Sequence, residues 1–70
     1  IFPNPAEESF TIVADGLFSF ELYDAGGAKL FSVYNQHGSY DGSLAGLPKG
    51  VYYLKITARQ GQLTEKLVRN

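Results

Sequence analysis

Residues 17–23 read LFSFELY and are followed by the four residues Asp-Ala-Gly-Gly. Phe18, Phe20 and Leu22 occupy alternate positions, and more polar side chains stand between them. This period-two alternation is typical of a β-strand with one dry and one wet face. The glycine pair favours the positive φ that a short hairpin loop requires. The sequence therefore predicts a hairpin whose second strand covers residues 29–34.

The same alternation recurs on both sides of this hairpin, and no window of eleven or more residues has a helical period. Turns are expected at Asp15-Gly16, at Gln60-Gly61 and at Leu47-Pro48-Lys49-Gly50, where proline and glycine suit a type I turn. Residues 35–46 have a looser pattern, since glycines interrupt them. The predicted strands cover residues 9–13, 17–23, 29–34, 40–44, 51–58 and 63–68. This rhythm predicts an all-β fold, a small antiparallel β-sandwich.

Length and composition exclude several classes of protein. The 70 residues allow one domain, and the absence of cysteine leaves packing alone to hold it together. Six scattered basic residues against seven acidic ones predict no nucleic-acid partner. No apolar run is long enough for a membrane helix, and no conventional export signal is seen. Because the chain starts at Ile1 and contains no methionine, we expect it to be part of a longer protein.

The sequence shows no enzyme, metal site or cofactor site. His37, Ser39 and Asp41 are close in sequence, but a catalytic triad is assembled from distant parts of a fold, so a solvated loop is the expected interpretation. A single histidine, no cysteine, and Glu7 and Glu8 pointing apart in an extended segment predict no metal site. The glycine spacing of a phosphate-binding loop is absent as well.

Four short motifs occur in a recognisable order. They are Phe2-Pro3-Asn4-Pro5-Ala6, Tyr23-Asp24-Ala25-Gly26-Gly27, Leu47-Pro48-Lys49-Gly50-Val51-Tyr52 and Lys66-Leu67-Val68. In this order and at this spacing, the chain resembles the C-terminal sorting domain of the type IX secretion system, in its type A form. The resemblance covers nearly the whole of residues 1–70.

The resemblance implies an immunoglobulin-like β-sandwich of about six to seven short strands, with no cofactor and no catalysis. Such a domain serves as an address for a cargo fused upstream of it, in a Gram-negative bacterium. The cargo would pass through the periplasm, and the outer-membrane translocon would recognise the domain. A surface sortase would then cleave the protein and attach the cargo to the cell surface. The protein is therefore expected to be secreted or on the cell surface; its oligomeric state stays open.

The candidate recognition surface lies in the C-terminal half, where an edge strand offers backbone groups to a partner. The candidate residues are Gly50, Tyr52, Tyr53, Lys55, Lys66, Leu67 and Val68. For Gly50 and Tyr52, a role in folding alone is the alternative. The motif residues expected to be structural are Pro3, Asn4, Pro5, Asp24, Gly26, Leu47 and Pro48.

Two other functions remain open at this point. An immunoglobulin- or fibronectin-like adhesive or carbohydrate-binding module would use exposed Tyr34, Tyr40 and Tyr53 to contact a glycan or a protein. A structural spacer would predict no export defect on deletion. Fold alone does not distinguish these functions, since sandwiches host many of them.

Overall fold

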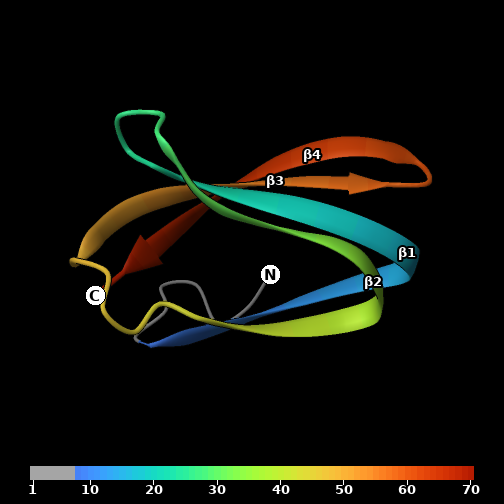
Figure 1. Ribbon diagram of the computed structural model, residues 1–70, viewed down its shortest axis with the longest axis horizontal. Helices are drawn as coiled ribbons and strands as arrows, with labels where there is room; N and C mark the ends of the chain where they lie inside the picture. Colours follow the sequence, from blue (N-terminus) through green and yellow to red (C-terminus); the bar gives the residue numbers. More distant parts are fainter. Residues whose placement is uncertain (1–7) are drawn as a thin grey trace.

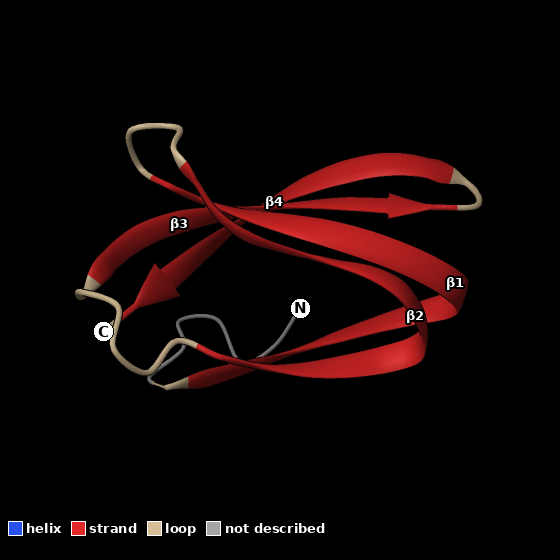
Figure 2. Cartoon of the chain, viewed as in Figure 1, coloured by secondary structure: helices blue, strands red, loops and turns tan. Residues whose placement is uncertain are grey.

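The computed structural model describes residues 8–70. Pro3, Asn4, Pro5 and Glu7, named above, lie outside this range. The described residues form four antiparallel strands and no helix (Figure 2). The strands are β1 (Ser9–Asp24), β2 (Lys29–Ser43), β3 (Gly50–Ala58) and β4 (Gly61–Arg69), in the sheet order β2-β1-β3-β4.

The all-β prediction is confirmed, whereas the number of strands is wrong. Predicted strands 9–13 and 17–23 are one continuous strand, β1, and predicted strands 29–34 and 40–44 both fall in β2, apart from Leu44, which follows it. The expected turn at Asp15-Gly16 is instead a bulge, because three residues of β1 stand opposite one residue of β2 between the pairs Val13/Ser39 and Leu17/His37. Gly16 has a φ of 96°, which lets the strand bend without ending.

The bend folds a single sheet over itself, so two separate sheets of a sandwich are not seen in residues 8–70. Phe10 and Phe20 are ten positions apart in β1, which would separate them by about 33 Å in a straight strand. Their ring centroids are 6.2 Å apart, edge to face. In Figure 1 the first part of β1 (blue) and the last part of β2 (yellow-green) accordingly form a lower layer beneath the rest of the sheet.

The core fills the space between the two layers and follows the predicted alternation. Its buried side chains are Phe10, Ile12, Phe18, Phe20, Leu22, Leu44, Tyr52, Leu54, Ile56 and Leu67. Both predicted hairpins are present, with Leu22 opposite Phe31 and Ala58 opposite Gly61. The turn before β3 lies earlier than predicted, since the amide of Leu47 donates to the carbonyl of Leu44.

Candidate recognition surface

The outer face of the upper layer carries a regular array of polar and aromatic side chains. Tyr53 of β3 lies directly between Tyr23 of β1 and Lys66 of β4. Lys55, two positions further along β3, stands opposite Glu21 of β1. Successive positions of a strand point to opposite faces, so these residues share the face turned away from the core. The structure thus brings together three of the predicted recognition residues: Tyr53, Lys55 and Lys66.

A hydrogen-bonded cluster lies on this face and was not predicted from the sequence. The Tyr23 hydroxyl donates to Glu21 Oε1 over 2.9 Å, and Lys29 Nζ lies 3.1 Å from Glu21 Oε2. These two hydrogen bonds hold the pKa of Glu21 below its ordinary value, and the bond from Tyr23 has the larger effect. The bond to Glu21 raises the pKa of Tyr23 and also that of Lys29. In the sequence, this cluster is indicated only by the spacing of Glu21 and Tyr23 on one strand and by Lys29 at the start of the next strand of the hairpin.

This cluster predicts an acid-dependent contribution to stability. A lowered carboxyl pKa stabilises the fold at a pH above the unfolded value of about 4.3, and the contribution is lost as pH falls through the folded pKa. We expect the melting temperature of the Glu21→Gln variant to fall less between about pH 6 and pH 3 than that of the unchanged protein. Glu8→Gln removes the same charge from an exposed position and is the control. Equal pH dependence in all three proteins would contradict the prediction.

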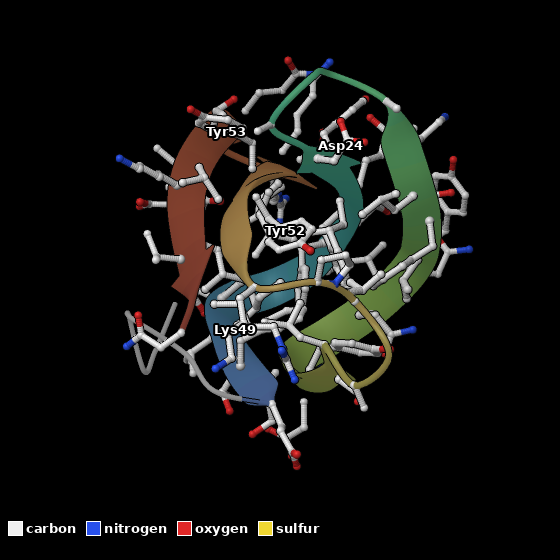
Figure 3. The ribbon with its side chains drawn as sticks, turned by 90° about the vertical axis from the view of Figure 1, so that its left-hand side faces the viewer. Asp24, Lys49, Tyr52 and Tyr53 are labelled. Atoms are coloured by element: carbon white, nitrogen blue, oxygen red, sulfur yellow. The ribbon has the colours of Figure 1, made fainter. Side chains whose placement is uncertain are left out.

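The other predicted recognition residues lie in different surroundings. Tyr52 and Leu67 are opposite one another, and their side chains are buried in the core with exposures of 4% and 0%. Figure 3 shows Tyr52 inside the ring of strands and Tyr53 on its outside. Gly50 begins β3 with a φ of 149°, which side-chain-bearing residues rarely adopt. Val68, opposite Val51, is half-buried. The alternation of β3 and β4 therefore points Tyr52 and Leu67 into the core and not to the outer face, and a part for them in recognition stays a prediction.

The second and third motifs meet at one end of the sheet, beside a cavity of about 360 Å³. Asp24 Oδ1 accepts hydrogen bonds of 2.9 Å from the amides of Gly26 and Ala28, which closes the hairpin loop. Leu47 packs against the core, and the carbonyl of Pro48 accepts a hydrogen bond from the Tyr52 hydroxyl. Figure 3 labels Asp24, the last residue of β1, and Lys49, in the loop before β3, both at the end of the molecule that faces the viewer. The bonds of Asp24 close the loop after β1, and the bond of Tyr52 joins β3 to the segment that precedes it.

Loss of the Tyr52 hydroxyl is expected to weaken this end of the sheet. Tyr52→Phe removes the donor to Pro48 and leaves the ring in the core. A hydrogen bond of this kind contributes about 0.5–1.5 kcal/mol, or several degrees of melting temperature in a domain this small. Thermal unfolding followed by circular dichroism measures the change. Tyr53→Phe is the matched control, since Tyr53 is partly exposed on the outer face, and an equal loss in both variants would contradict the assignment.

The three tyrosines proposed for an adhesive module do not form a common platform. Tyr34 is 59% exposed, and Tyr53 is 38% exposed. Tyr40 instead packs on the core, with its ring centroid 5.0 Å from that of Phe20. The bend of β2 turns Tyr40 toward the core.

The residues first considered for catalysis lie on a strand and not in a loop, which corrects the prediction. His37, Ser39 and Asp41 are exposed along β2, and Asp41 accepts a 2.9 Å hydrogen bond from the Thr11 hydroxyl. Within residues 8–70, no three His, Cys, Asp or Glu side chains are grouped so as to hold a metal ion. The same residues contain no helix long and apolar enough to cross a membrane.

Comparison with known families accounts for the motifs and for their order. No curated protein matches the chain significantly. The family of secretion system C-terminal sorting domains matches it over residues 1–70. The members of this family are sorting signals and not enzymes. The match therefore does not favour the alternative function of an adhesive or carbohydrate-binding module. The chain belongs to the secretion system C-terminal sorting domains, and it is a C-terminal sorting signal of the type IX secretion system.

Proposed function

We propose that residues 1–70 are a sorting domain of the type A form, which directs an upstream cargo through the outer-membrane type IX translocon of a Gram-negative bacterium. A surface sortase then cleaves the protein and attaches the cargo to the cell surface. The observation that carries this proposal is the family match over residues 1–70. A sorting signal implies secretion across the outer membrane or to the cell surface, with the cargo joined upstream.

We place the surface that the translocon recognises on the outer face of β3 and β4. Tyr53, Lys55 and Lys66 form its centre, and Val68 lies at its end. Two observations support this choice. Tyr53 and Lys66 are cross-strand partners, so their side chains present one continuous patch. Aromatic and basic groups on a rigid strand also suit a protein partner, because they combine apolar contact area with hydrogen-bond donors. Gly50, Tyr52 and Leu67 support this face from within the fold.

A reporter joined to the N-terminus of residues 1–70, in a host with an active type IX system, tests the proposal. We expect export to require these residues. Changing both Lys55 and Lys66 to glutamate is expected to lower export about tenfold, since reversing charge in an interface costs on the order of 1.4 kcal/mol or more. The melting temperature is measured beside export, because Lys55 stands opposite Glu21 and a glutamate at position 55 would place two like charges side by side, which lowers stability.

Lys49→Glu is the control, because Lys49 is exposed in the loop before β3, away from the outer face. It is expected to export normally. If export by the double variant falls only in proportion to its stability, the recognition surface lies elsewhere. Deleting residues 68–70 is a poorer test, because it removes the pairs of Val68 with Val51 and of Arg69 with Gly50, and so disturbs the fold.

A further inference from the structure

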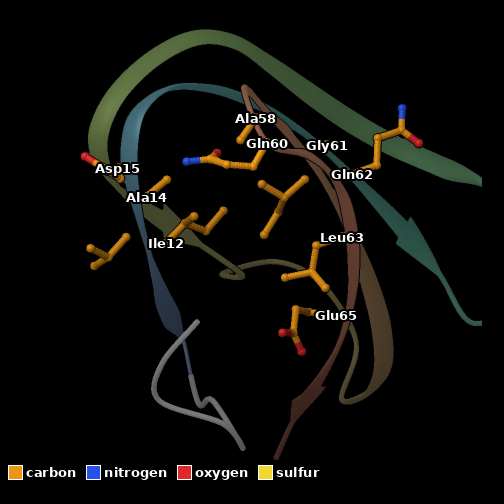
Figure 4. Close-up of a pocket in the computed structure, with 11 residues that line it drawn as sticks. Ile12, Ala14, Asp15, Ala58, Gln60, Gly61, Gln62, Leu63 and Glu65 are labelled. Carbon is orange, nitrogen blue, oxygen red and sulfur yellow. The ribbon is translucent and has the colours of Figure 1, made fainter.

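The folded-over sheet is open along one side, and this opening is an apolar groove. Its volume is about 320 Å³. Figure 4 shows Ile12 and Ala14 of β1 on one side of it and Leu63 and Glu65 of β4 on the other. Ile56 also lines the groove. Leu63 is 55% exposed there, although its position opposite Ile56 puts it on the inner face of the sheet. An inward-facing leucine therefore remains uncovered in the described part of the chain.

One side of the groove is a stretch of β1 whose outward backbone groups pair with no other strand of the described part of the chain. Residues 9–13 of β1 pair with β2 on one side, whereas β3 pairs only with Phe18–Asp24. The carbonyl of Glu8 accepts a hydrogen bond from the amide of Leu44. Since backbone groups alternate in direction along a strand, those of Ser9, Thr11 and Val13 point away from β2. Among residues 8–70, this stretch of β1 is a sheet edge, to which an extended segment adds readily.

The charge of the groove restricts what such a segment would be. Asp15 and Glu65 both line it, and no lysine or arginine does. Arg59, in the turn between β3 and β4, lines a different cavity. A segment lying here would therefore meet apolar side chains and two carboxylates. A strand complements both when it carries apolar residues and a lysine or arginine at positions two apart, because such positions share one face.

We propose that this groove receives an extended strand of a type IX secretion component, which adds to the β1 edge. The strand places apolar side chains against Ile12 and Leu63 and a basic side chain near Asp15 and Glu65. This inference rests on the proposed function, and it assigns to the translocon a second contact on a different face from that of Tyr53, Lys55 and Lys66.

Site-specific photo-crosslinking in the exported reporter tests the proposal. A photoreactive residue replaces Leu63 in the groove or Thr64, which neighbours it in β4 but points to the outer face. We expect position 63 to give a crosslink to an extended segment of a secretion component that carries apolar residues and a lysine or arginine at positions two apart, on one face of the segment. Thr64 should give at least about fivefold less of that product, because successive residues of a strand face opposite ways. A crosslink from position 63 to a second copy of the reporter, or to residues 1–7 of the same chain, would overturn the proposal, as would equal yields.

Charge reversal supplies the second measurement. Glu65→Lys is expected to reduce export about tenfold, and Glu8→Lys, an equal change outside the groove, to leave it unchanged. The melting temperatures of both variants show whether the fold is kept. If Glu65→Lys unfolds, the crosslink at position 63 alone tests the groove proposal. Normal export by a folded Glu65→Lys variant overturns the groove proposal while the sorting function stands. Export of a reporter lacking residues 1–70 would instead overturn the sorting function itself.

Discussion

Replacing Phe20 with alanine is expected to abolish the cooperative unfolding of this domain. The Phe20 ring meets Phe10 of the lower layer, Phe31 of β2 and Tyr40 beyond the bend, with ring centroids 5.0 to 6.2 Å away. Truncating a buried phenylalanine costs about 3–5 kcal/mol. A single core in a chain of this size rarely supplies more than about 3–5 kcal/mol in total. Circular dichroism should therefore show no sharp thermal transition.

Tyr34→Ala is the matched control for this change. It also removes an aromatic ring, but from a site that is 59% exposed. Its free energy of unfolding should change by about 0.5 kcal/mol or less. A Phe20→Ala variant that still melts sharply near the unchanged protein would contradict the central role given to this ring. Export of the Phe20→Ala reporter would add a separate result. If the unfolded domain were still exported, the signal would lie in the linear sequence and not in a shaped surface.

Replacing Gly42 with alanine is the second change expected to have a large effect. Gly42 of β2 lies opposite Phe10 of β1 in the lower layer, and the Phe10 ring covers it. A Cβ at position 42 would lie 2.3 Å from Phe10 Cζ and 2.6 Å from Cε1. Phe10 is completely buried, so the ring has little space to move. Overpacking of this kind costs about 1–3 kcal/mol, which is a large part of the stability of so small a domain.

Gly26→Ala is the control for the second change. The nearest atom to an added Cβ there is Asp24 Oδ1 at 3.5 Å, an ordinary contact. Chemical denaturation of both variants should give a lower midpoint for Gly42→Ala alone. In addition, the double variant Phe10→Leu with Gly42→Ala should lose less than the sum of the two single changes, because the smaller side chain makes room for the new methyl group. Strict additivity would show that the ring is not the cause.

Much of the local structure follows from the amino-acid sequence. The dry faces of residues 17–23 and 51–58 are apparent from alternation alone, because side chains of a strand point to opposite sides whatever the strand packs against. The hairpin loop after Tyr23 and the turn at Gln60-Gly61 are local as well, since neighbouring residues determine them. The order of the motifs also identified the family. None of these inferences needs a contact between distant residues.

The continuity of β1 and β2, the folding of one sheet into two layers, and the faces of individual residues were decided by tertiary structure. Asp15-Gly16 is compatible with a turn and with a bulge, and only the pairing of β1 with the whole length of β2 selects the bulge. The bend then turns Tyr40 toward Phe20 and leaves the groove open beside Leu63. These features depend on contacts between residues far apart in the chain, and local patterns carry no information about which distant surfaces will meet.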